Sequence, residues 1–213
     1  MKKMIKKAPD FKIEDNFANK TVAGVDEAGR GPWAGPVVSA AVILNREVKT
    51  PDINDSKKIS ESKRENIYNE IIMNHYFAVG IAEAHEIDRL NILQATKLSM
   101  VRALEKLYQT HEFDVIIIDG NFTVDFKKLE SMSVIKGDAL SLSIAAASII
   151  AKVTRDKIMK DLSAKFSDYG FDKHKGYGTK QHIEALDRFG VTKHHRKSFS
   201  PIKKLLCLNE RNG

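Results

Sequence analysis

The sequence predicts an α/β domain with a mixed sheet, followed by a helical C-terminal segment. Strand-like stretches come early in the chain, and helical patterns then alternate with further strands. No repeat, low-complexity stretch or Gly/Ser-rich linker divides the 213 residues. This length suits one large domain, or one domain with a small appendage.

Five strands are expected from runs of apolar and β-branched residues. They cover residues 21–27, 37–44, 76–82, 114–119 and 132–136. The second run is almost entirely apolar, so we expect both faces of that strand to be buried.

Helices are expected over residues 61–74, 87–109 and 140–165, with a short helix ending near Phe189. Ser60 or Ser62 can cap the first helix, and Thr179 and Gly190 flank the short one. Apolar residues at helical spacing predict the buried stripe of the second helix, namely Leu90, Leu93, Val101, Leu104 and Tyr108.

The composition places the chain among proteins of reduced compartments. Its single cysteine, Cys207, excludes an intramolecular disulfide and favours a cytoplasmic location. No apolar run reaches the roughly 18 residues that a membrane span requires. The basic N-terminus lacks the apolar region of a signal peptide, so we expect residues 1–20 to form a flexible basic arm. We also expect a monomer with no membrane partner.

The net charge of +7 and the pI near 9.3 suggest a polyanionic partner. Basic residues gather in the last forty or so positions, as in the stretch KHHRK. Such a cluster is typical of a surface that contacts phosphates. The alternative is a protein that is merely basic.

Four carboxylates occupy the ends of predicted strands. Asp26 and Glu27 end the first strand, Asp119 ends the fourth, and Asp138 follows the fifth. A charged group at the end of an apolar strand is unfavourable unless it is solvated, paired or bound to a metal. Carboxylates that converge at such a sheet edge suit Mg²⁺, whereas a single Asp there often only begins a loop.

The two neighbouring carboxylates raise a geometric question, because adjacent strand residues point to opposite faces. Either the chain turns at Ala28 and Gly29, or one residue contributes its main-chain carbonyl. The loop AGRGPWAGP that follows is neither a Walker loop nor a dinucleotide fingerprint. Its glycines allow the backbone to approach a small polar group such as a ribose hydroxyl, although a plain turn is the alternative.

Several motifs resemble those of ribonuclease HII, a type 2 ribonuclease H family. The opening motif is GVDEAGRGPWAGPVVSAAVIL at residues 24–44, with Trp33 where the family would have Leu. Further blocks follow in the family's order up to residue 201, namely DSKK (55–58), IDGN (118–121), KGD (136–138), SIAAASIIAKV (143–153), KGYGT (175–179) and HRKSFSP (195–201). The short N-terminal arm favours this family over ribonuclease HIII.

The resemblance implies a ribonuclease H-like fold, a mixed five-stranded sheet flanked by helices with a C-terminal helical extension. It places the catalytic domain at residues 21–165 and the substrate-binding extension at 166–213. It implies cutting of RNA in RNA/DNA hybrids, and cutting 5′ of single ribonucleotides in duplex DNA, leaving 5′-phosphate and 3′-hydroxyl ends. Two Mg²⁺ or Mn²⁺ ions would be held by Asp26, Glu27, Asp119 and Asp138.

The resemblance also implies how substrate is read. Gly29, Arg30 and Gly31 would sense the ribose 2′-hydroxyl, and Tyr177 would stack on the sugar of the following deoxyribonucleotide. Phosphate contacts are expected from Lys57, Ser148, Lys152, Lys175 and Arg196. His182, His194 and His195 are further candidates, with packing as the alternative. There are two competing hypotheses. One is a catalytically inactive protein that only binds hybrids, and the other is a different two-metal nuclease on the same fold.

Overall fold

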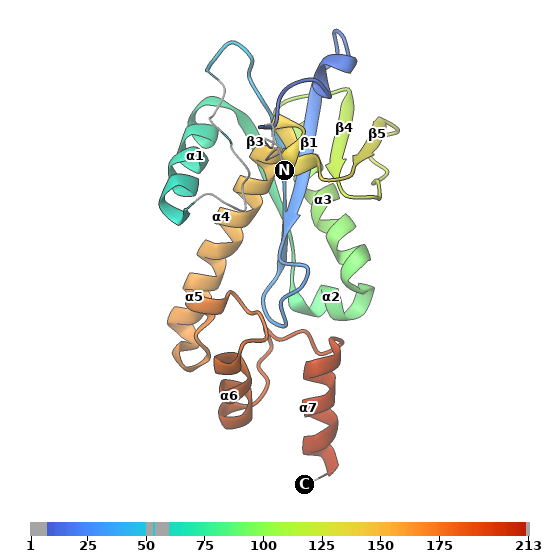
Figure 1. The fold of residues 1–213 in the computed structure, drawn as a ribbon. Coiled ribbons are helices and arrows are strands. Elements are labelled where there is room, and N and C mark those ends of the chain that lie inside the picture. The colour runs from blue at the N-terminus through green and yellow to red at the C-terminus, as the bar shows by residue number, and fades with distance from the viewer. Residues whose placement is uncertain (1–7, 50–52, 54–59, 212–213) are drawn as a thin grey trace, which may run out of the picture.

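A five-stranded mixed sheet lies at the centre of the computed structural model, which describes residues 8–49, 53 and 60–211 (Figure 1). The strand order is β3-β2-β1-β4-β5. β1 is antiparallel to β2 and parallel to β4; β2–β3 pairing is antiparallel, and β4–β5 pairing is parallel. The strands are β1 Val22–Ala28, β2 Val37–Ile43, β3 Tyr76–Ala82, β4 Val115–Asp119 and β5 Glu130–Val134. The predicted mixed sheet is confirmed, and β2 is buried along its whole length.

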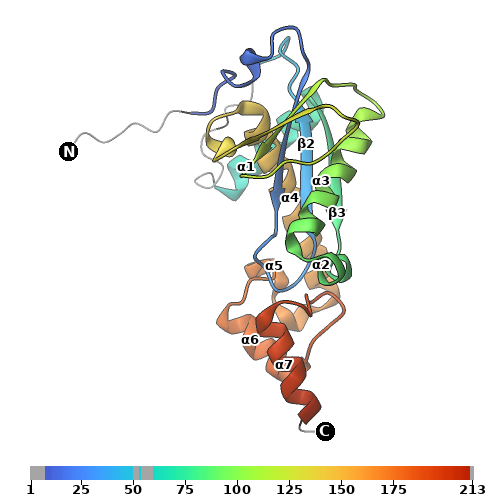
Figure 2. The same cartoon turned by 90° about the vertical axis from the view of Figure 1, so that its right-hand side faces the viewer.

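Helices cover both faces of the sheet (Figure 2). On one face, α4 Leu142–Lys165 packs against β1 and β2, and α1 Glu61–Asn74 packs beside it, against α4 and β3. On the other face, α3 Ile92–Tyr108 contacts β2 and β3 and shares an apolar core with β1 and β4. Ser60 is the cap of α1, because its side chain accepts a hydrogen bond from the Lys63 backbone amide.

The helix expected over residues 87–109 is two helices, so that prediction is wrong. α2 Ala84–Leu90 ends at Asn91, which has φ of 70° and begins α3. The Asn91 side chain accepts hydrogen bonds from the amides of Leu93 and Gln94, which is how asparagine initiates a new helix. The predicted stripe is also shifted, since Leu93 is 38% exposed. The residues of α3 that are buried are Ala95, Thr96, Ser99, Met100, Ala103, Leu104 and Leu107.

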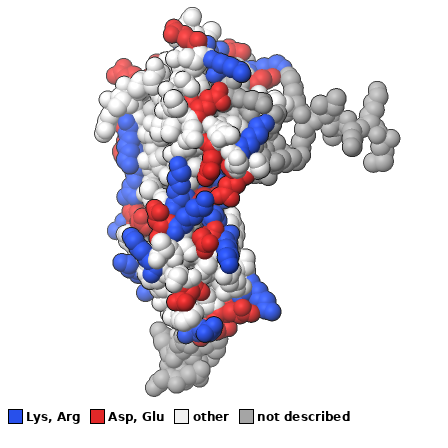
Figure 3. Space-filling view, turned by 90° about the vertical axis from the view of Figure 1, so that its left-hand side faces the viewer, with Lys and Arg blue, Asp and Glu red and all other residues white. Residues whose placement is uncertain are grey.

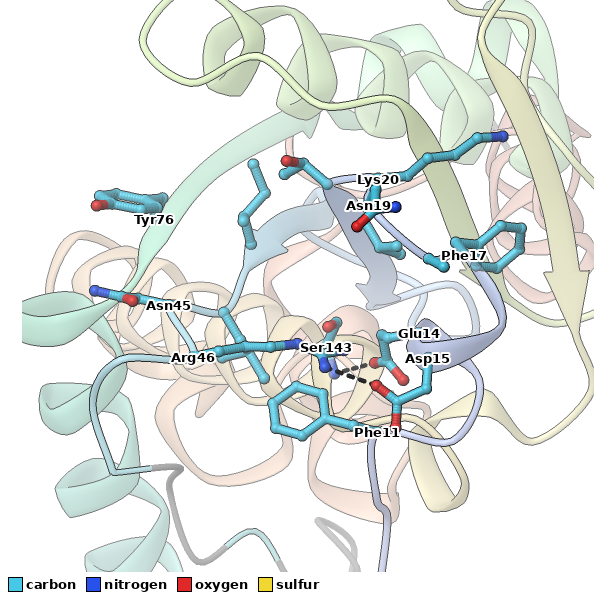
Figure 4. Close-up of a pocket in the computed structure, with 15 residues that line it drawn as sticks. Phe11, Glu14, Asp15, Phe17, Asn19, Lys20, Asn45, Arg46, Tyr76 and Ser143 are labelled. Atoms are coloured by element: carbon cyan, nitrogen blue, oxygen red, sulfur yellow. Dashed lines mark hydrogen bonds and ion pairs between the residues drawn. The ribbon is translucent and has the colours of Figure 1, made fainter.

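The described part of the expected arm, residues 8–20, is packed rather than free. It includes the short 3-10 helix η1 Glu14–Asn16. The Glu14 side chain is only 3% exposed and accepts hydrogen bonds from the Ser141 hydroxyl and the Ser143 amide. Figure 4 shows Glu14 and Ser143 beside a cavity of about 470 Å³, where Arg46 also pairs with Asp15 at 2.6 Å. The prediction of a flexible arm is therefore wrong for these residues.

The C-terminal segment is helical, as predicted, and packs on the far end of α4. It contains the 3-10 helix η3 Ser167–Tyr169 and the helices α5 Phe171–His174, α6 Lys180–Phe189 and α7 Ser200–Arg211. An apolar cluster joins it to Met159 and Leu162 of α4 and to Ala34 of the β1–β2 loop. Thr179 caps α6 as expected. None of the described helices combines the length and apolar character that a membrane crossing requires.

Candidate active site

Asp26 and Asp119 lie side by side at the carboxyl ends of the neighbouring parallel strands β1 and β4. Val25 pairs with Ile118, and the next residue of each strand is an aspartate, Asp26 or Asp119. Asp138 lies in the 3-10 helix η2 Gly137–Ala139, which follows β5. The Gly137 amide donates a hydrogen bond of 2.6 Å to Asp119 Oδ1, so the turn carrying Asp138 is tied to the end of β4.

Burial and mutual repulsion make this a place where negative charge is unfavourable. Asp26 is 5% exposed, and burial raises its pKa well above the ordinary value; the charges of Glu27 and Asp119 raise it further. A hydrogen bond from the Ser148 side chain acts in the opposite direction. Burial also raises the pKa of Glu27, against the lowering effect of Arg30. These carboxylates are therefore poised to accept positive charge.

Glu27 carries an oxygen that the described protein does not satisfy. Its Oε2 is buried and has no hydrogen-bond partner, while Oε1 lies 3.4 Å from Arg30 Nη1. Asp26 and Glu27 are both still paired with β2, and the turn at Gly29 comes only after them. The turn therefore does not bring the Glu27 side chain to the face of the sheet on which the Asp26 side chain lies. Among the described residues, no three His, Cys, Asp or Glu side chains are gathered closely enough to hold a metal ion.

A cavity of about 390 Å³ reaches one of the four carboxylates, Glu27, and brings several predicted residues together. It is lined by Glu27, Ala28, Gly29, Arg64, Ser148, Ile149, Lys152, Arg155 and Tyr177. The Tyr177 side chain is 49% exposed, and a Cβ placed on Gly31 would lie 3.4 Å from its ring. The glycine loop and Tyr177 are thus neighbours, although they are well over a hundred residues apart in sequence.

Arg196 is not a phosphate contact, and that prediction is wrong. Its side chain is fully buried and donates to three main-chain carbonyls of the glycine loop. Nε bonds Gly35 at 3.0 Å, Nη1 bonds Arg30 at 2.9 Å and Nη2 bonds Gly29 at 2.5 Å. Burial lowers its pKa to about 9. The guanidinium therefore holds the main chain of the glycine loop from the buried side.

Arg155 has a similar role that the sequence did not reveal. It is 1% exposed, and it donates to the carbonyls of Pro36, Ala34 and Lys175 at 2.9, 3.1 and 3.0 Å. Burial lowers its pKa to about 10. The available signals were its place on the same helix as Ser148 and Lys152, and its position with Asp156 in the motif block that follows Asp138 and resembles the family's. Arg155 joins the glycine loop to the segment that carries Tyr177.

The remaining predicted phosphate contacts differ in their surroundings. Lys152 lines the cavity and pairs with Asp156 at 2.8 Å, and Ser148 bonds Asp26. Lys175 donates to the Asp172 carbonyl through Nζ. Lys57 lies outside the described residues. On the face with α1 and α4, Lys and Arg side chains gather near the middle beside acidic ones (Figure 3), so basic groups are not confined to the C-terminal segment.

His182 and His195 are buried, at 0% and 1% exposure, so they do not reach phosphate. Their Nε2 atoms lie 3.0 Å apart, and His174 stacks on His182 with ring centroids 4.6 Å apart. His194 packs edge-on against Phe166. Packing is therefore the correct alternative for this cluster.

Stability should fall on acidification because of these two histidines. Burial lowers the pKa of both His182 and His195 to about 4, with the neighbouring histidines adding to it. Between about pH 4 and the ordinary value near 6.5, the unfolded chain binds more protons than the folded chain. The contribution of the two neutral histidines to the free energy of unfolding is complete above about pH 6.5 and is lost as the pH falls toward 4.

Asp26 and Glu27 act with the opposite sign, because their raised pKa values favour the folded state as they take up protons. The measurement is therefore made in an Asp26→Asn background, by thermal unfolding between pH 7 and pH 5. We expect the melting temperature to fall across this range, and to fall less when His182→Asn is added. Equal slopes with and without His182 would contradict the assignment.

The chain matches the family model described as Ribonuclease HII over residues 23–202. It is 51% identical over 195 residues to a ribonuclease HII of Wolbachia sp. subsp. Brugia malayi (strain TRS), which covers 91% of this chain and 94% of that protein. The solved ribonuclease H2 of Pyrococcus horikoshii OT3 superposes with a TM-score of 0.75 at 27% identity, covering 90% of this chain and 100% of that one.

A second solved structure is the ribonuclease HII of Archaeoglobus fulgidus in its complex with PCNA. It superposes with a TM-score of 0.69 at 25% identity, over 84% of this chain and 95% of that chain. The family match spans the sheet, the carboxylates and the C-terminal segment up to the start of α7. The chain therefore belongs to the ribonuclease HII family.

Proposed function

We propose that this ribonuclease cuts the RNA strand of RNA/DNA hybrids, and cuts 5′ of single ribonucleotides in duplex DNA, at the carboxyl ends of β1 and β4. The observation that gives this proposal the most support is that a carboxylate, the glycine loop and Tyr177 lie around one cavity. Glu27, whose charge raises the pKa of the buried Asp26 beside it, lines a cavity that is also lined by Gly29 and Tyr177. The products are a 5′-phosphate and a 3′-hydroxyl.

The carboxylates suit two divalent cations, Mg²⁺ or Mn²⁺. A bound cation would give the buried Oε2 of Glu27 the partner that it lacks. It would also stabilise the charged form of Asp26 and so lower the raised pKa of that carboxyl. Asp26, Glu27, Asp119 and Asp138 would hold the ions, and a ribonuclease HIII of the same fold has been solved in complex with Mn²⁺. When bound, such ions supply an activated water and stabilise the leaving 3′ oxygen.

The surrounding residues orient this centre. Ser148 donates its side-chain hydrogen bond to Asp26, which fixes the rotamer of that carboxylate. The Gly137 amide does the same for Asp119 Oδ1. Arg30 lies against Glu27 and limits the net negative charge near an incoming phosphate. Each group reduces the reorganisation required when substrate arrives.

The glycine loop reads the ribose. Arg196 turns the carbonyls of Gly29 and Arg30 toward the protein interior, so the opposite side of the loop, beside Tyr177, faces the cavity. The positive φ of 97° at Gly29, and the Arg155 side chain where its Cβ would be, leave no room for another residue. A 2′-hydroxyl placed between the loop and Tyr177 distinguishes RNA from DNA.

The test is a labelled DNA duplex that contains one ribonucleotide, incubated with the full chain and Mg²⁺ or Mn²⁺. We expect a single cut 5′ of the ribonucleotide, and its loss when a chelator is added. The matched control is the same duplex with the 2′-hydroxyl replaced by hydrogen, which should remain intact. An absence of metal-dependent cutting would refute the proposal, and cutting of the all-DNA control would refute the ribose readout.

A further inference from the structure

Two buried histidines form a hydrogen-bond relay whose direction is determined by its ends. His182 Nδ1 lies 3.0 Å from the Tyr177 main-chain carbonyl, which can only accept, so Nδ1 carries the proton. At the other end, the Thr192 backbone amide donates to His195 Nδ1 at 3.0 Å, so that nitrogen carries none. The link between the two rings must then run from His195 Nε2–H to His182 Nε2, over 3.0 Å.

Both rings are neutral in this arrangement, and a further proton has no place. A proton on His182 Nε2 would face the His195 Nε2–H, and a proton on His195 Nδ1 would face the Thr192 amide. The low pKa of both residues, about 4, agrees with this geometry. His174 and Phe171 enclose the pair, and Lys193 lies on the adjacent loop. The relay is therefore a fixed set of bonds at neutral pH.

The relay ends on the residue whose ring borders the cavity. Tyr177 has an exposed side chain, and the loop around it is also held through Gly176, whose carbonyl accepts from the Trp33 amide at 2.8 Å. The next residue after His195 is Arg196, which shapes the glycine loop. One buried dipeptide thus supports both the glycine loop and Tyr177.

We propose that His182 and His195 are positioning residues that set the main chain of Tyr177, and thereby the angle at which its ring meets the sugar. The inference rests on the proposed role of Tyr177 in substrate contact. Without the relay, the Tyr177 carbonyl keeps the bond from the Thr179 amide at 2.8 Å but loses the one from the buried imidazole, so the tie between the loop 175–179 and α6 weakens. Small displacements of a substrate-positioning group are enough to lower the rate by about 10- to 100-fold.

A double-mutant cycle tests whether His182 acts through Tyr177. The four proteins are the wild type, His182→Phe, Tyr177→Ala and the double variant, and the readout is kcat/KM on the single-ribonucleotide duplex. We expect His182→Phe to lower kcat/KM about tenfold, and to have no further effect in the Tyr177→Ala background. Additive losses would overturn the proposal, because a merely structural role weakens both backgrounds equally.

Two further variants separate positioning from stability. His182→Asn places an amide donor where Nδ1 lies, so it should restore most of the activity that His182→Phe loses. Tyr169→Phe removes a hydroxyl that donates to the Gly190 and Phe189 carbonyls in the same cluster, without touching Tyr177. It should lower the melting temperature and leave kcat/KM unchanged. Equal loss of kcat/KM in Tyr169→Phe would contradict the inference.

The tautomers give a measurement on the unmodified protein. Nitrogen-15 NMR of the histidine rings should show His182 protonated at Nδ1 and His195 protonated at Nε2. His174 is the internal reference, because its Nε2 lies 2.7 Å from the Tyr169 carbonyl and must carry the proton. An Nε2–H tautomer at His182 would overturn the relay even if every variant failed to fold.

The two possible failures are distinguishable. If Tyr177→Ala cuts like the wild type, the proposed role of Tyr177 is wrong. If Tyr177→Ala is impaired while His182→Phe is not, Tyr177 contacts substrate and the relay does not position it. Only the predicted pattern, loss in both single variants without additivity, supports both statements.

Discussion

Asp26→Asn is expected to lower cutting of the single-ribonucleotide duplex on the order of 10³-fold or more, the scale seen when a catalytic group is removed. Asn preserves the shape and can still accept the Glu27 amide hydrogen bond to Oδ1. It removes one of the negative charges that meet at the ends of β1 and β4. The rate is measured at saturating Mg²⁺, alongside duplex binding by fluorescence anisotropy.

The same substitution should stabilise the protein when a chelator is present. The raised pKa of Asp26 means that its charged form is disfavoured in the folded chain at neutral pH. Removing such a charge should raise the free energy of unfolding by about 1 kcal/mol. A lower melting temperature in chelator, or cutting at the wild-type rate, would contradict this account of Asp26.

Asp138→Asn should likewise abolish cutting and leave hybrid binding intact.

Arg196→Ala is expected to be among the most destabilising single changes in the chain. It leaves the carbonyls of Gly29, Arg30 and Gly35 without their buried donor and opens a cavity. The expected loss is about 3–5 kcal/mol in the free energy of unfolding. For a chain of this size, that corresponds to a melting temperature lower by roughly 10 °C.

The neighbouring residue supplies the matched control. Lys197 has an exposed side chain, and the hydrogen bond from its backbone amide to Asp88 remains when the side chain is truncated. The free energy of unfolding of Lys197→Ala should therefore stay within about 0.5 kcal/mol of the wild-type value. Arg196→Lys keeps the charge but not the fork that reaches three carbonyls, so most of the loss should remain. A wild-type melting temperature for Arg196→Ala would show that the loop does not depend on this guanidinium.

The fold was predictable because its strands have strong local patterns. The runs at 21–27, 37–44 and 76–82 became β1, β2 and β3 with small shifts at their ends. β5 was placed two residues late, since it is half-exposed and its pattern is weak. The break at Asn91 was missed because apolar periodicity continues across it; only the positive φ of that residue separates the helices.

The candidate site was predictable in its residue types but not in its buried scaffold. The carboxylates, the glycine loop and Tyr177 lie near one another, as expected from the resemblance. Arg155 and Arg196 occur in a chain with 35 basic residues, where an arginine is usually solvated. Nothing local distinguishes a guanidinium that binds carbonyls from one that binds phosphate. That distinction depends on which loops the chain brings around it.

The dependence of the glycine loop on Arg196 has a consequence for synthesis. Residues 29–35 leave the ribosome early, together with β1, but their buried donors are at Arg155 and Arg196. Contacts between such distant parts of a chain form late. A chain that stops before residue 196 contains all five strands and the four carboxylates, yet it lacks the guanidinium that holds the carbonyls of the glycine loop. The proposed ribose readout therefore depends on a residue that is synthesised near the end of the chain, and truncated products carry the acidic residues without that support.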